Sequence, residues 1–180
     1  MTNTQTKTTK LAKMAMLVAI SIVLVALIHF PIFPMVAFLE YDPADVPILI
    51  GTFAFGPAAG ILLTVVTSLL QGLTVSAQSG AYGIIMHIIA TSVLTCVAGT
   101  IYRRNKTKKS AIIGLVCGTL AMTATMFCAN LIITPLFMGT TREVVMSLMP
   151  FILAFNAVKA GINSIITFFV YKRISPFLHR

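Results

Sequence analysis

Long apolar segments alternate along the chain with short polar or basic segments. The apolar segments cover residues 10–30, 46–71, 81–102, 110–134 and 146–171. Each is long enough to cross the hydrocarbon core of a bilayer as a helix, which takes about 20 residues. The pattern therefore predicts an all-α integral membrane bundle, with residues 1–180 forming a single membrane domain.

The segment at 46–71 is divided by helix-breaking residues. Phe55-Gly56-Pro57 stands near its middle, where glycine favours a turn and proline lacks a backbone donor. We therefore expect two helices here, over residues 46–55 and 57–76, which brings the total to six transmembrane helices. A helix of about ten residues spans only about 15 Å. The first of this pair is thus expected to need support from its flanks, from tilt or from thinned lipid.

Basic residues mark one side of the predicted membrane. The chain has thirteen Lys and Arg, four Asp and Glu, and a formal net charge of +9. Eleven of the thirteen basic residues lie in three segments, at residues 7–13, 103–109 and 172–180. The positive-inside rule assigns these segments to the cytoplasm, so both the N- and C-termini are predicted to be cytoplasmic. Because the positive charge is concentrated in these segments, we interpret it as a signal for membrane orientation and expect no nucleic-acid partner.

The four acidic residues lie outside the apolar segments and are assigned to loops on the other side of the membrane. Asp42-Pro43 is typical of a turn, and Asp45 is expected to cap the helix that follows rather than to bind a ligand. Tyr41 is expected either to stack on a planar ligand or to mark the membrane interface. With no carboxylate inside the membrane, the chain lacks the group on which a proton-coupled carrier usually depends.

The last apolar segment carries three polar residues on one predicted helix face. Asn156, Lys159 and Asn163 are spaced at i, i+3 and i+7, which a helix aligns. A lysine at bilayer depth costs about 2.5–3.5 kcal/mol on insertion scales, so it is retained where it faces a bundle interior, a wet cavity or a ligand. The alternative is a structural lysine that hydrogen-bonds neighbouring helices. We expect a ligand pocket that opens to the extracellular side.

Other polar residues lie in or near the apolar segments. Asn130 stands about one turn from the outer end of its segment, and Gln78 lies in the outer turn near residues 72–80. His87 is interpreted as a hydrogen-bonded packing residue. Three cysteines without metal or disulfide spacing are interpreted as small buried apolar residues: Cys96, Cys117 and Cys128.

The sequence contains no glycine-rich phosphate loop, no zinc-binding spacing and no nucleophile motif of the common hydrolases. This argues against an enzyme and against ATP hydrolysis by this chain. A site of amides, a lysine and aromatic rings suits a planar ligand rich in heteroatoms, because amides pair with ring nitrogens and carbonyls while rings stack on its faces.

At this level of detail the chain resembles the S components of energy-coupling factor (ECF) vitamin transporters. The resemblance covers nearly the whole chain and is most specific at residues 41–47, 51–57 and 156–159, which are similar to the riboflavin-binding group. It implies a multi-pass protein of the bacterial plasma membrane that captures riboflavin outside. Delivery would need a transmembrane coupling subunit and two ATPases. Riboflavin would be the transported substrate, and no cofactor is expected.

The resemblance also implies site residues. Asn130, Asn156 and Lys159 would hydrogen-bond the vitamin, and the loop that ends at Tyr41 and Asp42 would cover it. Further ligand-binding candidates are Leu39, Asn163 and Gln78. An A-x-x-x-A pattern of small residues, which lets another helix approach closely, would meet the coupling subunit at Ala15 and Ala19.

Several alternatives stay open at this point. The chain could be an S component for folate, thiamine or pantothenate, or could also accept flavin mononucleotide. It could instead be a self-sufficient secondary carrier, or a structural membrane protein without a ligand, in which case leucine would replace Asn156 and Lys159 without loss of folding.

Overall fold

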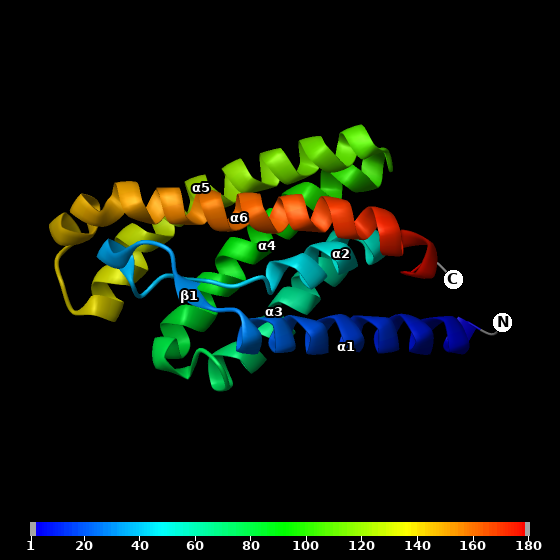
Figure 1. Ribbon diagram of the computed structural model, residues 1–180, viewed down its shortest axis with the longest axis horizontal. Helices are drawn as coiled ribbons and strands as arrows, with labels where there is room; N and C mark the ends of the chain where they lie inside the picture. The colour runs from blue at the N-terminus through cyan, green and yellow to red at the C-terminus, as the bar shows by residue number, and fades with distance from the viewer. Residues whose placement is uncertain (1–2, 179–180) are drawn as a thin grey trace.

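The computed structural model describes residues 3–178, and these residues fold into a bundle of six α-helices (Figure 1). The helices are α1 (Asn3–Leu27), α2 (Asp45–Phe55), α3 (Pro57–Leu73), α4 (Gly80–Arg104), α5 (Lys108–Met138) and α6 (Arg142–Leu178). The connection between α1 and α2 contains β1 (Phe30–Pro31), the 3₁₀ turn η1 (Pro34–Val36) and β2 (Glu40–Tyr41), and η2 (Ala77–Ser79) precedes α4. Four helices, α1, α4, α5 and α6, are long and apolar enough to cross a membrane. The predicted all-α membrane bundle is confirmed.

The helices run alternately in opposite directions along the long axis of the bundle. Both termini and the connection between α4 and α5 lie at one end, and the connections after α1, α3 and α5 lie at the other (Figure 1). The three basic segments of the sequence therefore share one end of the molecule. Which side of the membrane this end faces stays a prediction from the positive-inside rule.

The short helix α2 is enclosed by protein. It packs against α1, α3, α4 and α6, and the side chains from Asp45 to Phe53 are all buried. We expected this short helix to need support from its flanks, from tilt or from thinned lipid; the structure shows that neighbouring helices surround it. Gly56, at φ +95°, turns the chain, and Pro57 starts α3 where a helix needs no backbone donor.

Several helix ends differ from the expected limits of 10–30, 57–76 and 110–134. Helix α1 ends at Leu27 and α3 at Leu73, each about one turn early, whereas α5 passes through Pro135 to Met138. Proline removes only its own amide donor, so one more turn still forms. That turn closes at Gly139, whose left-handed backbone lets its N–H donate to the Pro135 carbonyl.

The connection between α1 and α2 is anchored by its own small apolar cluster. β1 and β2 pair antiparallel, with Phe30 opposite Tyr41. Between them the fully buried Val36 packs with Val145, Met149 and Ile152 of α6. This contact fixes residues 28–44, here called the cover loop, across one end of the bundle.

The expectation of buried cysteines was wrong. Cys96 and Cys128 are exposed and Cys117 is half-buried. In a membrane bundle the outer surface faces acyl chains, which are as apolar as the protein interior. An apolar neighbourhood in the sequence therefore does not distinguish burial in protein from contact with lipid.

Candidate ligand-binding pocket

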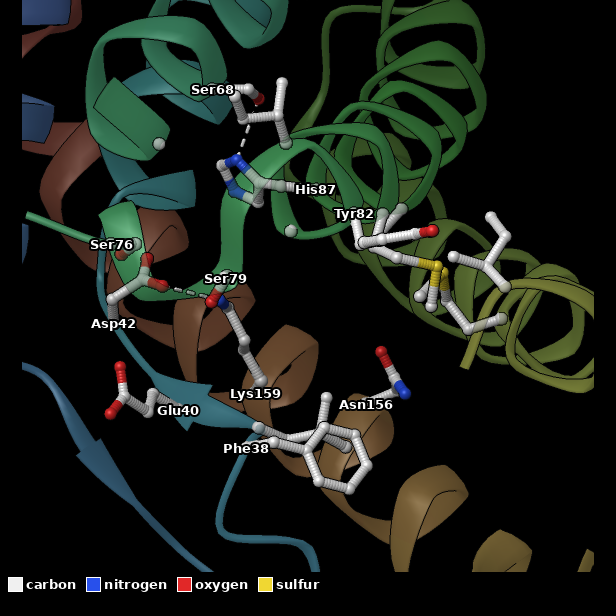
Figure 2. Close-up of a pocket in the computed structure, with 18 of the residues that line it drawn as sticks. Phe38, Glu40, Asp42, Ser68, Ser76, Ser79, Tyr82, His87, Asn156 and Lys159 are labelled. Carbon is white, nitrogen blue, oxygen red and sulfur yellow. Dashed lines mark hydrogen bonds and ion pairs between the residues drawn. The ribbon is translucent and has the colours of Figure 1, made fainter. Parts of the chain in front are cut away.

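A pocket lies beneath the cover loop, at the end of the bundle opposite the termini (Figure 2). Its empty volume, counted out to open solvent, is about 1040 Å³. The cover loop, α3, η2, α4, α5 and α6 all contribute side chains to its wall. The polar lining residues are His29, Glu40, Asp42, Ser68, Gln71, Ser76, Ser79, Tyr82, His87, Asn130, Thr134, Asn156 and Lys159.

The rest of the wall is apolar and rich in flexible side chains. Met86, Met122 and Met126 line it together with Ile133 and Phe155. Thioethers are polarisable and adapt to the face of a flat aromatic ring. Three further rings stand together in the lining, since Phe137 lies 6.1 Å from Phe38 and 5.9 Å from Tyr82 between ring centroids. The pocket therefore offers a broad apolar slot beside its polar groups.

Lys159 reaches the pocket from α6 and is ion-paired there. Its Nζ lies 2.7 Å from Oδ2 of Asp42, which the cover loop supplies (Figure 2). Only 9% of the lysine side chain and 5% of the aspartate side chain are exposed. The expectation that Lys159 faces the bundle interior is confirmed. A buried lysine is stabilised by an opposite charge, and no pattern in the sequence indicates that Asp42 provides it.

Asp42 also organises the cover loop and the end of α3. Its Oδ1 accepts the backbone N–H of Ala44 at 3.1 Å, and Nε2 of Gln71 donates to its Oδ2 at 3.4 Å. Nε2 of Gln71 also donates to Ser76, whereas Oε1 of Gln71 is buried and has no hydrogen-bond partner among the described residues. Buried acceptors without a partner are uncommon. Gln71 is therefore a candidate for contact with a ligand donor.

Asp45 is the centre of a second buried cluster behind the pocket. Its Oδ1 accepts a hydrogen bond from Thr91 at 2.7 Å and lies 3.3 Å from Nε2 of His87, and its Oδ2 accepts from Asn163 at 3.2 Å. Nδ1 of His87 in turn lies 2.8 Å from the Ser68 hydroxyl (Figure 2). The expected packing role of His87 agrees with these hydrogen bonds, although the ring also lines the pocket.

Two expectations about Asp45 were wrong. It is the first residue of α2 rather than a cap, because Ala44 occupies the cap position and no side-chain cap bond forms. It does not lie in a solvated loop either, because its exposed fraction is 0%. The carboxylate is retained in the interior because donors from α4 and α6 converge on it. The chain therefore does contain a buried carboxylate, and the sequence-based argument against a proton-coupled carrier no longer holds.

Tyr41 and Asn163 lie behind the pocket rather than in its wall. The Tyr41 hydroxyl donates to Oδ1 of Asn163 at 3.0 Å, and Nδ2 of Asn163 donates to the Asp42 carbonyl. Burial, and then the nearby Asp42 carboxylate, raise the pKa of Tyr41 above its ordinary value, so the phenol stays a donor. These contacts hold the cover loop against α6. Neither side chain is among the residues that line the pocket.

Asn130 and Asn156 both lie in the pocket wall, and they differ in which hydrogen-bonding groups remain free for a ligand. Asn130 donates to the Met126 carbonyl, and its Oδ1 accepts from Thr134. Asn156 donates to the Ile152 carbonyl at 2.8 Å, and its Oδ1 accepts nothing from the described part of the chain. Each amide retains a second N–H, and Asn156 also offers its carbonyl.

Of the two remaining expected site residues, one lines the pocket and the other does not. Leu39 lines the pocket beside Phe38. Gln78 is exposed in η2 and is not among the residues that line the pocket, whereas Gln71 of α3 is. The sequence signal for Gln71 was a single amide next to Leu69 and Leu70 in an otherwise apolar run.

The chain is similar to a known protein family over most of its length. The profile of the family described as "ECF transporter, substrate-specific component" matches residues 9–171. This chain belongs to that family. It is therefore an integral protein of the bacterial plasma membrane with a role in transport.

Curated relatives of the chain are riboflavin transporters. It is 32% identical over 158 residues to riboflavin transporter RibU of Staphylococcus aureus (strain TCH60), covering 84% of this chain and 82% of that protein. It is 25% identical over 161 residues to riboflavin transporter FmnP of Bacillus subtilis (strain 168), covering 84% and 85%.

Solved structures show the same fold. One described as the S component of a bacterial ECF transporter superimposes with a TM-score of 0.82 at 32% identity, covering 97% of this chain and 99% of that chain. ThiT from Listeria monocytogenes superimposes with a TM-score of 0.70 at 17% identity, covering 97% and 98%. Because the identity is only 17%, the second similarity shows a shared fold and nothing further.

Proposed function

We propose that this chain is the riboflavin-binding S component of an ECF importer. The observation that carries the proposal is the pocket beneath the cover loop, in a chain that is 32% identical to a riboflavin transporter over most of its length. The pocket combines an apolar slot with amides and a lysine, which is the set of groups that a flavin needs.

The chemistry of riboflavin agrees with this wall. Its isoalloxazine ring is flat and uncharged, with carbonyls and ring nitrogens along one edge, and its ribityl chain carries hydroxyls. The methionine-rich slot would hold the faces of the ring, while Asn130 and Asn156 would pair with its polar edge. Lys159 would donate to a carbonyl or a hydroxyl while keeping its bond to Asp42, since an ammonium has three donors.

The energies are sufficient for tight binding. Hydrogen bonds to charged groups contribute about 1.5–3 kcal/mol each, and burial of a flat ring adds an area term. Together these can approach the roughly −12 kcal/mol of a nanomolar complex. Flavin mononucleotide differs only by a phosphate on the ribityl end, and the lining contains both a carboxylate, Glu40, and an ammonium, Lys159.

Transport would depend on partner subunits. We propose that a transmembrane coupling subunit and two ATPases supply the energy, and that riboflavin is cargo rather than a cofactor. Ala15 and Ala19 are both exposed on α1, which leaves their small side chains available for close approach by a partner helix.

The test is riboflavin binding by the purified protein. Protein purified in detergent should be yellow, and calorimetry should give tight binding of riboflavin and none of thiamine, folate or pantothenate. Asn156→Ala should weaken binding at least about tenfold, which is the loss of about 1.4 kcal/mol. Asn105→Ala, an exposed asparagine at the other end of the bundle, is the matched control. Colourless protein that binds another of these vitamins would overturn the proposal.

A second candidate is a carrier that needs no ATPase. The buried carboxylates of Asp42 and Asp45 favour it, since such groups serve proton relays in pumps and transporters. Proteoliposomes that contain only this chain distinguish the two. We expect no riboflavin accumulation under an imposed proton gradient, and accumulation would replace the importer proposal with the carrier.

A further inference from the structure

A second cavity lies at the opposite end of the bundle from the riboflavin pocket. It is lined by α2, the end of α4, the α4–α5 connection, the start of α5 and the end of α6, and its empty volume, counted out to open solvent, is about 600 Å³. Figure 1 places this connection at the end that carries both termini. Its wall and its rim have different chemistry, and neither is used in binding riboflavin.

The wall of the cavity is aromatic. Phe53, Tyr102 and Tyr171 pack together, with ring centroids 4.5 Å, 5.4 Å and 5.9 Å apart in pairs, and Phe168 adds a fourth ring. Aromatic rings of this kind, with hydroxyls, are typical of the depth at which acyl chains give way to headgroups.

The rim of the cavity is cationic. Lys106, Lys108 and Lys172 all line it, and all three are exposed. Neither of the two described ion pairs involves these lysines. The four acidic residues of the chain lie at positions 40, 42, 45 and 143, none of them in this cavity. Three positive charges therefore converge on one opening without a described carboxylate to neutralise them.

The start of α5 adds to the positive field. Thr107 caps this helix, accepting the N–H of Ser110 at 3.2 Å, and Lys108 is its first residue. The N-terminal end of a helix carries a partial positive charge and favours phosphate. The cap and the lysines thus act on the same side of the cavity.

The cavity borders the apolar outer surface of the bundle. Ile112 follows the lining residue Ala111, and Phe169 precedes Lys172 by about one helical turn. Both Ile112 and Phe169 are strongly exposed, as expected for side chains that contact acyl chains. A molecule with an anionic head and an apolar tail can therefore place its head at the rim and its tail along this surface. A soluble anion would make no use of the aromatic wall or of the apolar surface.

We propose that this cavity binds the phosphate of an anionic phospholipid from the adjoining leaflet. Basic pockets between transmembrane helices on the cytoplasmic side are suited to such headgroups. The lysines would bind the phosphate as point charges, and the rings would pack against the glycerol and the upper acyl chain. The site is independent of the vitamin and would tie the α4–α5 connection and the end of α6 to the membrane surface.

Native mass spectrometry on the purified protein tests the proposal. The probes are phosphatidylglycerol and phosphatidylcholine with the same acyl chains, added in equal amounts. We expect the protein to retain phosphatidylglycerol over phosphatidylcholine by about tenfold, because each lysine near the surface adds to the binding of an anionic lipid. Inorganic phosphate and glycerol 3-phosphate should not displace it. Displacement by either would replace the lipid site with a site for soluble anions.

Matched charge variants locate the site. Combined Lys106→Gln, Lys108→Gln and Lys172→Gln should lower phosphatidylglycerol retention about tenfold, and Lys108→Glu alone should also lower it. Combined Arg103→Gln, Arg104→Gln and Lys109→Gln removes the same number of positive charges from the same end of the bundle but touches no lining residue. That control should change retention less than about twofold. Equal losses in the two triple variants would overturn the proposal in favour of diffuse attraction.

Folding is monitored separately by circular dichroism melting. All of the replaced side chains are exposed, so the melting temperatures of the variants should match that of the unaltered protein. These lipid measurements contain no riboflavin. A failure of the lipid proposal would therefore appear in lipid retention, whereas a failure of the proposed function would appear in riboflavin binding.

Discussion

Lys159 and Asp42 form a charge pair that is almost completely enclosed by protein. The pair links α6 to the cover loop across 117 residues of sequence, and the ammonium also lines the pocket. In a low-dielectric interior, the loss of either partner leaves an uncompensated charge. The proposed site therefore gives the two residues a part in folding and in ligand binding at once, and single substitutions cannot separate these contributions.

A double substitution separates them. Lys159→Met or Asp42→Asn alone should each destabilise the protein by about 3–5 kcal/mol, because each leaves one buried charge unpaired. The double variant should recover most of that stability, yet bind riboflavin at least about tenfold more weakly. Denaturation in mixed micelles and calorimetry measure the two effects. Additive losses of stability would show that the pair is not coupled.

Asp45 gives a purely structural prediction. Thr91 and Asn163 donate to its carboxylate, and His87 lies within hydrogen-bond distance of it, so Asp45→Leu would remove one hydrogen-bond partner from each of these three side chains. Each unsatisfied group costs about 1–3 kcal/mol, so the protein should lose most of its stability. Glu143→Gln, at an exposed carboxylate, should leave the melting temperature unchanged. A stable Asp45→Leu variant would contradict the assigned network.

At the residue scale, the sequence identified polar groups within apolar helices but not their partners. The cost of a lysine in an apolar helix pointed directly to Lys159 and its neighbour Asn156. The burial of Asp45 depends on donors that lie 42 to 118 residues away, so no local pattern reveals it. Gln71 was missed because its contact with the Asp42 carboxylate joins residues 29 positions apart, which no local pattern reveals.

At the scale of elements, the α2–α3 hairpin determines how closely the interior can pack. Gly60 of α3 lies against the Thr52 side chain of α2 and close to Thr95 of α4, so an added methyl group would overlap Thr52. The Thr52 hydroxyl already donates to the Ile48 carbonyl at 2.8 Å and cannot turn aside without losing that bond.

Alanine substitutions at two helical glycines test this packing. Gly60→Ala should lower stability by about 1–3 kcal/mol, the usual cost of overpacking. Gly161→Ala in α6 meets nothing within 4 Å, so it should be neutral or stabilise the helix by up to about 1 kcal/mol. Thermal unfolding of the two variants in the same detergent provides the comparison. Equal melting temperatures would argue against a tight α2–α3 contact.

At the scale of the whole molecule, the arrangement of charge along the bundle axis orients the protein. The termini and the α4–α5 connection lie together, opposite the cover loop and the pocket (Figure 1). With the basic end in the cytoplasm, the pocket would open to the exterior.

Cysteine accessibility tests this orientation. In a background without Cys96, Cys117 and Cys128, a membrane-impermeant maleimide applied to intact cells should label Thr141→Cys, in the exposed α5–α6 connection. It should label Asn105→Cys, in the exposed α4–α5 connection, only after the cells are permeabilised. The reverse pattern would place the pocket on the cytoplasmic side.

Most of the fold followed from the sequence because bilayer thickness fixes the length of an apolar segment. The basic segments and the break at Gly56 correctly gave six helices with alternating direction. Helix limits were less predictable, since Pro135 is tolerated near a helix end and the cover loop gains its form from contacts with α6. The sidedness of the pocket still depends on charge alone.

The enclosure of α2 has a consequence for biogenesis. Eleven residues with a carboxylate at one end are too short and too polar to be retained by lipid alone when they leave the translocon. They can be accommodated only together with α3, so the two helices should enter the membrane together as one helical hairpin. Nascent chains truncated before and after α3 would show this: α2 should resist alkaline extraction only once α3 has emerged.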